Sequence, residues 1–278
     1  MTDEADDPLQ PDLSGDSVTR LARRADSLLF SLAQTTDEIT QAYRLVYRNY
    51  LRSEYIDPHP SEMRYTVFNA LPKTATFIAR LRDAVTTTAS VIFDSPLGLP
   101  LEAIYHEEVD ELRRNNARLC EVTMLADRRR AGMRTIPAIL QLFKLVFHYT
   151  LRFEKTTDIV ITINPSHEAF YTRYLPFEDL AGLRRYPSVK GAPAIAKRAN
   201  LARIVRDART LRLGDFFVDS PPSLDMFGEK KRFTQDELRE LFVLKREILP
   251  KLPKHAVDYV RSQYPDYDFE RIMAPARK

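Results

Sequence analysis

One region of the sequence alternates strands and helices and carries an acid inside an apolar strand. The run ARLCEVTMLA (117–126) predicts a buried strand with Glu121 at its centre. A strongly apolar helix is expected over 136–153, a short strand over 158–164, and a further helix after Pro165. An isolated carboxylate is costly to bury unless it is paired or solvated. Glu121 therefore marks a candidate functional site.

The remaining pattern predicts a mixed α/β protein built on a single sheet. Thr35 and Glu38 have the spacing of a helix-capping box, and the helix that follows repeats apolar residues three and four positions apart. Further strands are expected over 28–34, 74–80, 86–94, 177–185 and 189–197, and a further helix over 101–116.

The chain is expected to divide into three segments. Residues 1–16 have the composition of a disordered acidic tail. Residues 17–205 form the mixed α/β domain. Residues 206–278 are expected to be a helical extension, in which Thr234 and Glu237 form a second capping box.

The composition excludes several classes of protein. The only cysteine, Cys120, cannot form an internal disulfide, and nothing indicates a metal site. No apolar run approaches the roughly 20 residues that span a bilayer, so no integral membrane segment is expected. The acidic N-terminal sequence has neither the charge nor the apolar core of a signal peptide. A cytoplasmic location is the simplest expectation.

Charge is distributed unevenly along the chain. Residues 1–16 hold six acids and no Lys or Arg, so the remainder carries 42 basic and 33 acidic residues, a net charge of +9. The basic residues gather in three places, at Arg128, Arg129, Arg130 and Arg134, at Arg184 and Arg185, and at Lys197 and Arg198. Such clusters indicate an anionic partner, although solvated surface charge is an equally good explanation. Nucleic acid is less favoured, because the clusters lack a binding motif and interleaved aromatic residues.

Several short motifs follow one another in a fixed order. They are Tyr43-Arg44-Leu45-Val46-Tyr47, Asp94-Ser95 with Gly98-Leu99-Pro100, Glu108 with Leu112-Arg113, Glu121-Val122-Thr123 with Leu125-Ala126, Asn164-Pro165-x-His167-x-x-Phe170-Tyr171, and Gly191-Ala192-Pro193-Ala194. With these motifs, residues 28–197 resemble the GNAT acyltransferase superfamily, and more narrowly the bacterial long-chain N-acyl amino acid synthases, which are related to autoinducer synthases. The resemblance implies an α/β (α+β) fold with a mixed, mostly antiparallel central sheet flanked by helices.

The resemblance also implies a reaction. Such enzymes transfer a long-chain acyl group from an acyl carrier protein thioester to the amino group of an amino acid, with acyl-phosphopantetheine as co-substrate and no tightly bound cofactor. A loop with one glycine, at 128–134, favours a carrier protein over coenzyme A, and the +9 charge suits an acidic carrier. Met124 stands where autoinducer synthases typically have an arginine, which weakens a lactone-type product. A coenzyme A-dependent N-acyltransferase, an acyl-homoserine-lactone-type signal synthase and a non-catalytic GNAT-like binding protein remain alternatives.

The resemblance assigns roles to individual residues. Glu121 is expected to be the catalytic base and Tyr171 the acid that protonates the leaving thiolate, although each is also explained as a structural residue. Backbone groups at Val122 and Thr123 are expected to face the thioester, and Arg44 to bind the amino acid's carboxylate unless it is simply an exposed helical arginine. Tyr47 and Phe143 are expected to line an acyl tunnel or, equally, the core. The phosphopantetheine or carrier site is expected at Arg128, Arg129, Arg130 and Arg134.

Overall fold

A seven-stranded sheet forms the centre of the protein. The computed structural model describes residues 28–128, 135–223 and 226–275, so the expected acidic tail (1–16) lies outside the described residues. The strand order is β1-β2-β3-β4-β5-β7-β6. The strands are β1 (Leu29–Leu32), β2 (Ala75–Leu81), β3 (Ala84–Phe93), β4 (Leu119–Asp127), β5 (Asp158–Ile163), β6 (Glu178–Tyr186) and β7 (Ala192–Asn200).

All neighbouring strands are antiparallel except β4 and β5, which are parallel. The 18-residue helix α4 (Thr135–Arg152) connects these two strands, as a parallel pair requires a crossover connection. The expected mixed, mostly antiparallel sheet is thus confirmed.

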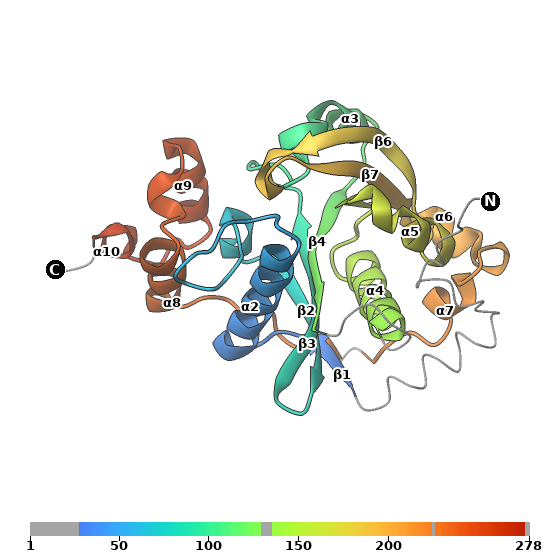
Figure 1. Cartoon of the computed structure of the whole chain (residues 1–278), viewed down its shortest axis with the longest axis horizontal. Coiled ribbons are helices and arrows are strands. Elements are labelled where there is room, and N and C mark those ends of the chain that lie inside the picture. Colours follow the sequence, from blue (N-terminus) through green and yellow to red (C-terminus); the bar gives the residue numbers. More distant parts are fainter. Residues whose placement is uncertain (1–27, 129–134, 224–225, 276–278) are drawn as a thin grey trace, which may run out of the picture.

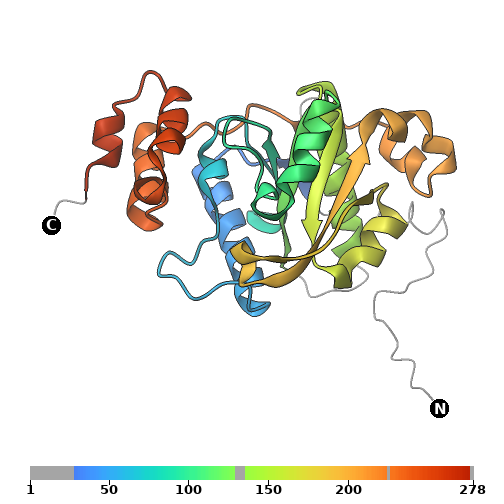
Figure 2. The same ribbon diagram turned by 90° about the horizontal axis from the view of Figure 1, so that it is seen from above.

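Helices cover both faces of the sheet (Figures 1 and 2). Helices α2 (Thr36–Arg52) and α3 (Glu102–Arg114) pack on one face, whereas α4 and α5 (Glu168–Tyr174) pack on the other. Thr35 caps α2 through the expected capping box with Glu38. The buried side of α2 carries the expected stripe, including Ile39, Tyr43 and Tyr47.

The helical extension divides between the two faces of the sheet. Helices α6 (Leu201–Arg206) and α7 (Gly214–Val218) contribute to the same apolar cluster as α4. The chain then crosses to the α2 side, where α8 (Gln235–Arg239), α9 (Lys254–Ser262) and α10 (Phe269–Met273) lie (Figure 1). The described helices of the extension therefore pack in two groups, one on each face of the sheet.

Candidate active site

Glu121 is the third residue of β4 and is only 1% exposed. Its Oε2 accepts a hydrogen bond of 2.8 Å from the backbone N–H of Leu101, the N-cap residue directly before α3. The neighbouring residues Cys120 and Val122 belong to the apolar cluster under α4. Because successive side chains of a strand alternate between its faces, Glu121 points to the opposite face, toward α2 and α3. Cys120 is a packed, buried thiol, as expected.

The surroundings of Glu121 prepare it to take up a proton near neutral pH. Burial raises the pKa of its carboxyl to about 8, and the nearby Glu102 adds to the rise. The N–H of Leu101 acts in the opposite direction, since it stabilises the charged form. A carboxylate with a pKa near the working pH is well matched to general base catalysis.

Strands β4 and β5 part directly after Glu121. The paired residues are Leu119 with Asp158, Cys120 with Ile159 and Glu121 with Val160, and the register extends no further among the described residues. Beyond this point β4 pairs only with β3, and β5 only with β7. Backbone groups along the separated edges are therefore available to an extended ligand.

A bulge in β4 follows within three residues of Glu121. Met124 has a positive φ of 55°, which a non-glycine residue rarely adopts. The register with β3 shifts here, because Ser90 pairs with Thr123 whereas Thr88 pairs with Ala126. The bulge brings the consecutive side chains of Thr123 and Met124 to line the same cleft.

This cleft has a volume of about 310 Å³ and lies on the face to which Glu121 points. Its walls are largely apolar and include Ile92, the residue that pairs with Glu121 across the sheet. Tyr50 and Tyr186 also line it. Burial raises the pKa of both phenols, and the Glu121 carboxylate adds to each shift. The charge of Glu121 therefore acts on two residues that line the cleft, although Glu121 itself is not among its lining residues.

One guanidinium lines the cleft, and it belongs to Arg64. Its Nη2 donates to the carbonyl oxygen of Ser188 at 3.2 Å, and its Cζ lies 5.9 Å from the centre of the Tyr50 ring. Within the described part of the chain, no carboxylate forms an ion pair with Arg64. Arg44, expected to bind a carboxylate, is instead exposed on α2 and does not line the cleft.

Tyr171 lies on α5, on the face covered by α4, and packs edge to face against Phe143 and Phe177. Burial raises the pKa of its phenol, and Tyr50 adds to that rise. Tyr50 therefore interacts electrostatically with both Glu121 and Tyr171. The expected base and the expected acid lie on opposite faces of the sheet, and Tyr171 does not line the cleft.

The other residues predicted to bind substrate or carrier lie in different parts of the fold. Tyr47 is buried, and its hydroxyl accepts a hydrogen bond from the backbone N–H of His59 at 3.0 Å. Phe143 and Val122 are buried in the cluster under α4, away from the cleft. Thr123 does line the cleft. Arg128 is exposed beside the end of β4, and Arg129, Arg130 and Arg134 lie outside the described residues.

Two of the basic clusters are largely neutralised within the fold. Lys197 is only 2% exposed, and its Nζ lies 2.5 Å from oxygens of both Glu168 and Asp179. Arg198 pairs with Asp158 at 2.8 Å, and Arg184 pairs with Glu108 at 2.5 Å. These side chains hold strands and helices together, so the anionic partner expected from their sequence clustering is not supported at these positions.

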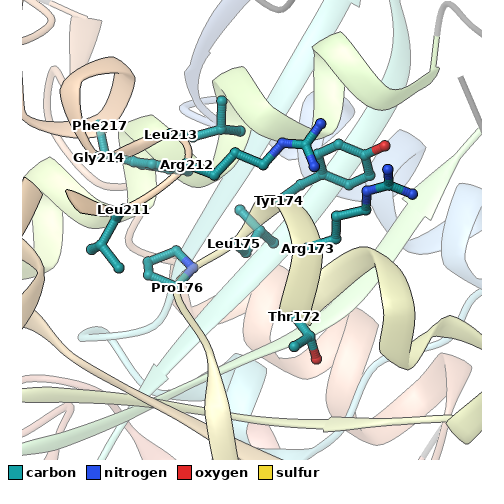
Figure 3. A pocket seen from close by; sticks show the side chains of 10 residues that line it. All are labelled: Thr172, Arg173, Tyr174, Leu175, Pro176, Leu211, Arg212, Leu213, Gly214 and Phe217. Carbon is teal, nitrogen blue, oxygen red and sulfur yellow. The ribbon is translucent and has the colours of Figure 1, made fainter. Parts of the chain in front are cut away.

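A second pocket lies between α5 and α7 and has a volume of about 70 Å³. Figure 3 shows the side chains of Arg173 and Arg212 beside the ring of Tyr174, with distances from Cζ to the ring centre of 5.9 and 5.3 Å. It has room for a few water molecules and shares no lining residue with the cleft beside Glu121. The larger cleft is therefore the candidate active site.

Neither metal chemistry nor a membrane span is indicated in the residues that the structure describes. No group of three or more His, Cys, Asp or Glu side chains is placed to hold a metal ion there. None of the helices in the same residues is long and apolar enough to cross a bilayer.

The sequence did not reveal Tyr50, Arg64 and Tyr186 as site residues. Tyr50 ends the apolar stripe of α2 and is indistinguishable by spacing from its core members. Arg64 lies in an irregular segment without periodicity, and Tyr186 ends an edge strand far along the chain. Only the folded arrangement brings these three residues together.

Comparisons with known proteins identify the family. A search of curated proteins found no match to this sequence. The solved structure of FeeM, an N-acyl amino acid synthase from uncultured soil microbes, is 26% identical in sequence to this chain. The match covers 68% of this chain and 96% of the FeeM chain, with a TM-score of 0.59. The AHL synthase LasI is 12% identical, with 63% and 89% of the two chains covered and a TM-score of 0.48.

An acyl-CoA N-acyltransferase from Pseudomonas aeruginosa is 14% identical, with 62% of this chain and 99% of that chain covered and a TM-score of 0.43. The family model of the N-acyl amino acid synthase FeeM matches residues 41–200, which include the parted strands, Glu121, Arg64 and Tyr171. Since this match spans more than half of the chain, the protein belongs to the FeeM family of N-acyl amino acid synthases, which are N-acyltransferases.

Proposed function

We propose that this protein joins a long-chain acyl group, delivered as a thioester on the phosphopantetheine arm of an acyl carrier protein, to the amino group of an amino acid. The observation that carries the proposal is the position of Glu121, buried at the point where β4 and β5 part and beside a cleft of about 310 Å³. An extended phosphopantetheine arm fits between separated strand edges, because their backbone groups can bind its amides.

The acceptor amine must lose a proton before or during its attack on the thioester. The ammonium group of a free amino acid is mostly protonated near neutral pH. Glu121, whose pKa is raised to about 8, is the group that takes this proton, directly or through a water molecule. The amine nitrogen then forms a bond to the thioester carbonyl carbon, and the negative charge that develops on the carbonyl oxygen faces the backbone N–H groups of β4 from Val122 onward.

Collapse of the tetrahedral intermediate breaks the carbon–sulfur bond. The thiolate that leaves takes a proton from Tyr171, which stays protonated because burial raises its pKa. The Tyr171 phenolate regains a proton as the nitrogen of the intermediate loses its second one, directly or through water. Glu121 gives the first proton to solvent, so both groups return to their starting states. The products are an amide and a free phosphopantetheine thiol, so no cofactor is consumed or required.

Arg64 is the residue we propose for the carboxylate of the amino acid. It lines the cleft beside Tyr50, and a guanidinium binds a carboxylate through two parallel hydrogen bonds. Arg44 was the sequence-based candidate, but it is exposed on α2 and does not line the cleft, so Arg64 replaces it in this proposal.

Two further features favour a carrier protein as donor. The net charge of +9 outside the first 16 residues suits an acidic partner. The segment at 128–134 has one glycine, whereas a coenzyme A pyrophosphate is usually cradled by several. We further propose a cytoplasmic location, because the single cysteine is a buried free thiol.

The test is a direct assay with defined substrates. The purified protein is offered a long-chain acyl carrier protein or the matching acyl-coenzyme A, each with twenty amino acids, and products are identified by mass spectrometry. We expect an N-acyl amino acid from the carrier donor. Product from coenzyme A alone would replace the donor assignment, a lactone would replace the acceptor assignment, and no product with either donor would indicate a binding protein.

A further inference from the structure

Arg113, on α3, binds three carboxylates at once. Its Nε and Nη2 bind the two oxygens of Asp94 at 2.8 and 2.7 Å, and its Nη1 and Nη2 bind those of Glu102 at 2.9 and 2.5 Å. Nη1 also donates to Asp110 at 2.8 Å. Asp94 is the main cause that raises the pKa of the Arg113 guanidinium, so the side chain stays charged. Such forked, charge-assisted contacts fix geometry as well as charge.

Two of these carboxylates, Asp94 and Glu102, lie at the two ends of the 94–102 loop, which leads into α3. Asp94 follows β3, and its backbone N–H donates to the carbonyl oxygen of Leu119 in β4 at 3.1 Å. Glu102 is the first residue of α3, and its Oε1 accepts a hydrogen bond of 2.6 Å from the N–H of Leu99. Arg113 therefore holds the start and the end of this loop together.

The loop carries the hydrogen-bond donor of Glu121. The backbone N–H of Leu101 donates to Glu121 at 2.8 Å, and Leu101 directly precedes Glu102. Gly98 approaches the Glu102 carboxylate closely, because a Cβ at this position would lie 2.6 Å from Oε1 of Glu102, and its φ of +72° favours glycine. A shift at Glu102 would therefore also displace Leu101.

We propose that Arg113 is a positioning residue for the acyl transfer, which holds the 94–102 loop so that Leu101 donates to Glu121 and which compensates the charge of Glu102 beside that base. The inference rests on the proposed base role of Glu121. It concerns a residue that does not itself line the cleft, and it assigns a function in the reaction to an ion-pair cluster that would otherwise only stabilise the fold.

The two effects of Arg113 act on Glu121 in the same direction. Without Arg113, the negative charge of Glu102 is uncompensated, and that charge raises the pKa of Glu121. In the intact protein the hydrogen bond from Leu101 lowers the pKa of Glu121. A loosened loop weakens this bond, so its loss also raises the pKa of Glu121. The other titratable groups that act on or near Glu121 are Tyr50 of α2, Tyr186 of β6 and Cys120 of β4, and Arg113 contacts none of them.

The test compares the pH dependence of kcat/KM in the wild type, Arg113→Met and Arg113→Lys. In Arg113→Met we expect the inflection assigned to Glu121 to move upward by about one pH unit and kcat to fall by roughly tenfold to a hundredfold. Arg113→Lys keeps the charge but loses the fork, so its inflection should stay near the wild-type position while kcat remains reduced. Arg114→Met, at an exposed neighbouring position on the same helix, is the matched control and should behave as the wild type.

A double variant separates charge from folding effects. Adding Glu102→Gln to Arg113→Met removes the uncompensated charge, and the inflection should return toward the wild-type position. If folded Arg113→Met keeps both the wild-type inflection and kcat, Arg113 is only structural and the inference is overturned. If Arg113→Met does not fold, a wild-type kcat in Arg113→Lys overturns it instead. Full activity of Glu121→Gln would remove the proposed base itself, so the two failures are distinguishable.

Discussion

Replacing Glu121 with glutamine tests both the chemistry and the electrostatics of the site. Glutamine has nearly the same shape, and its side-chain oxygen can still accept the hydrogen bond from the N–H of Leu101. It cannot take up a proton from the amine. We therefore expect turnover to fall by roughly a hundredfold or more, while the variant folds normally. Glu111→Gln, at an exposed position on α3, serves as the matched control.

The raised pKa of Glu121 also makes the stability of the folded protein depend on pH. The pKa of Glu121 rises from 4.5 to about 8 in the folded protein, which corresponds to ~5 kcal/mol when the carboxyl is ionised in both states. Below pH 4.5 the carboxyl is protonated in both the folded and the unfolded protein, so it does not reduce the free energy of unfolding. As pH rises to about 8, the folded protein retains a proton that the unfolded chain has lost, so wild-type stability decreases across this window. Glutamine does not titrate, so Glu121→Gln should become increasingly more stable than the wild type over the same range.

Two measurements check these expectations. Urea unfolding of both proteins at pH 5, 7 and 8.5 should show a stability gap that widens by several kcal/mol toward high pH. The wild-type profile of kcat/KM should contain an inflection near pH 8 that is missing in Glu121→Gln, whose profile follows only the ionisation of the amine. Undiminished turnover in Glu121→Gln would refute the base role. A gap that does not change with pH would refute the raised pKa.

Three further substitutions test other parts of the arrangement. Arg64→Lys should raise KM for the amino acid by roughly tenfold with little change in kcat, because the paired contact to the carboxylate is lost; steady-state kinetics with varied amino acid will measure this. Tyr171→Phe retains the ring contacts with Phe143 and Phe177 but lacks the acidic proton, so single-turnover rates should fall by roughly tenfold to a hundredfold with an unchanged melting temperature. Tyr105→Phe removes the hydroxyl that donates to the carbonyl oxygens of Gly182 and Ala194, and urea unfolding should show a loss of about 1–3 kcal/mol.

Local patterns predicted the elements of the fold well because each element is encoded by its own residues. Both capping boxes, at Thr35 with Glu38 and at Thr234 with Glu237, begin helices as expected. The strands expected over 74–80 and 86–94, the apolar helix expected over 136–153 and the strand that carries Glu121 are also confirmed. Capping and periodicity depend on contacts within a few residues, so they are readable in the sequence.

The site was predicted less completely because its contacts join distant segments. Arg44 and Arg64 look equally suitable for a carboxylate, but only the packing of the segment before residue 67 places Arg64 in the cleft. Lys197 and Arg198 look like one basic cluster, yet their partners, Asp179 and Asp158, come from the two neighbouring strands. Charge along the sequence does not reveal which acids lie across a strand pair.

The bulge at Met124 has a consequence for altering substrate preference. In a regular strand, successive side chains point to opposite faces of the sheet, so changing one wall of a cleft usually requires substitutions at non-consecutive positions. Here the consecutive residues Thr123 and Met124 both line the cleft of the candidate active site. A library that randomises this single dipeptide would vary one continuous surface of the binding site while leaving Glu121 and the ladder before it intact, which makes these two codons an economical starting point for redirecting the enzyme to new amines.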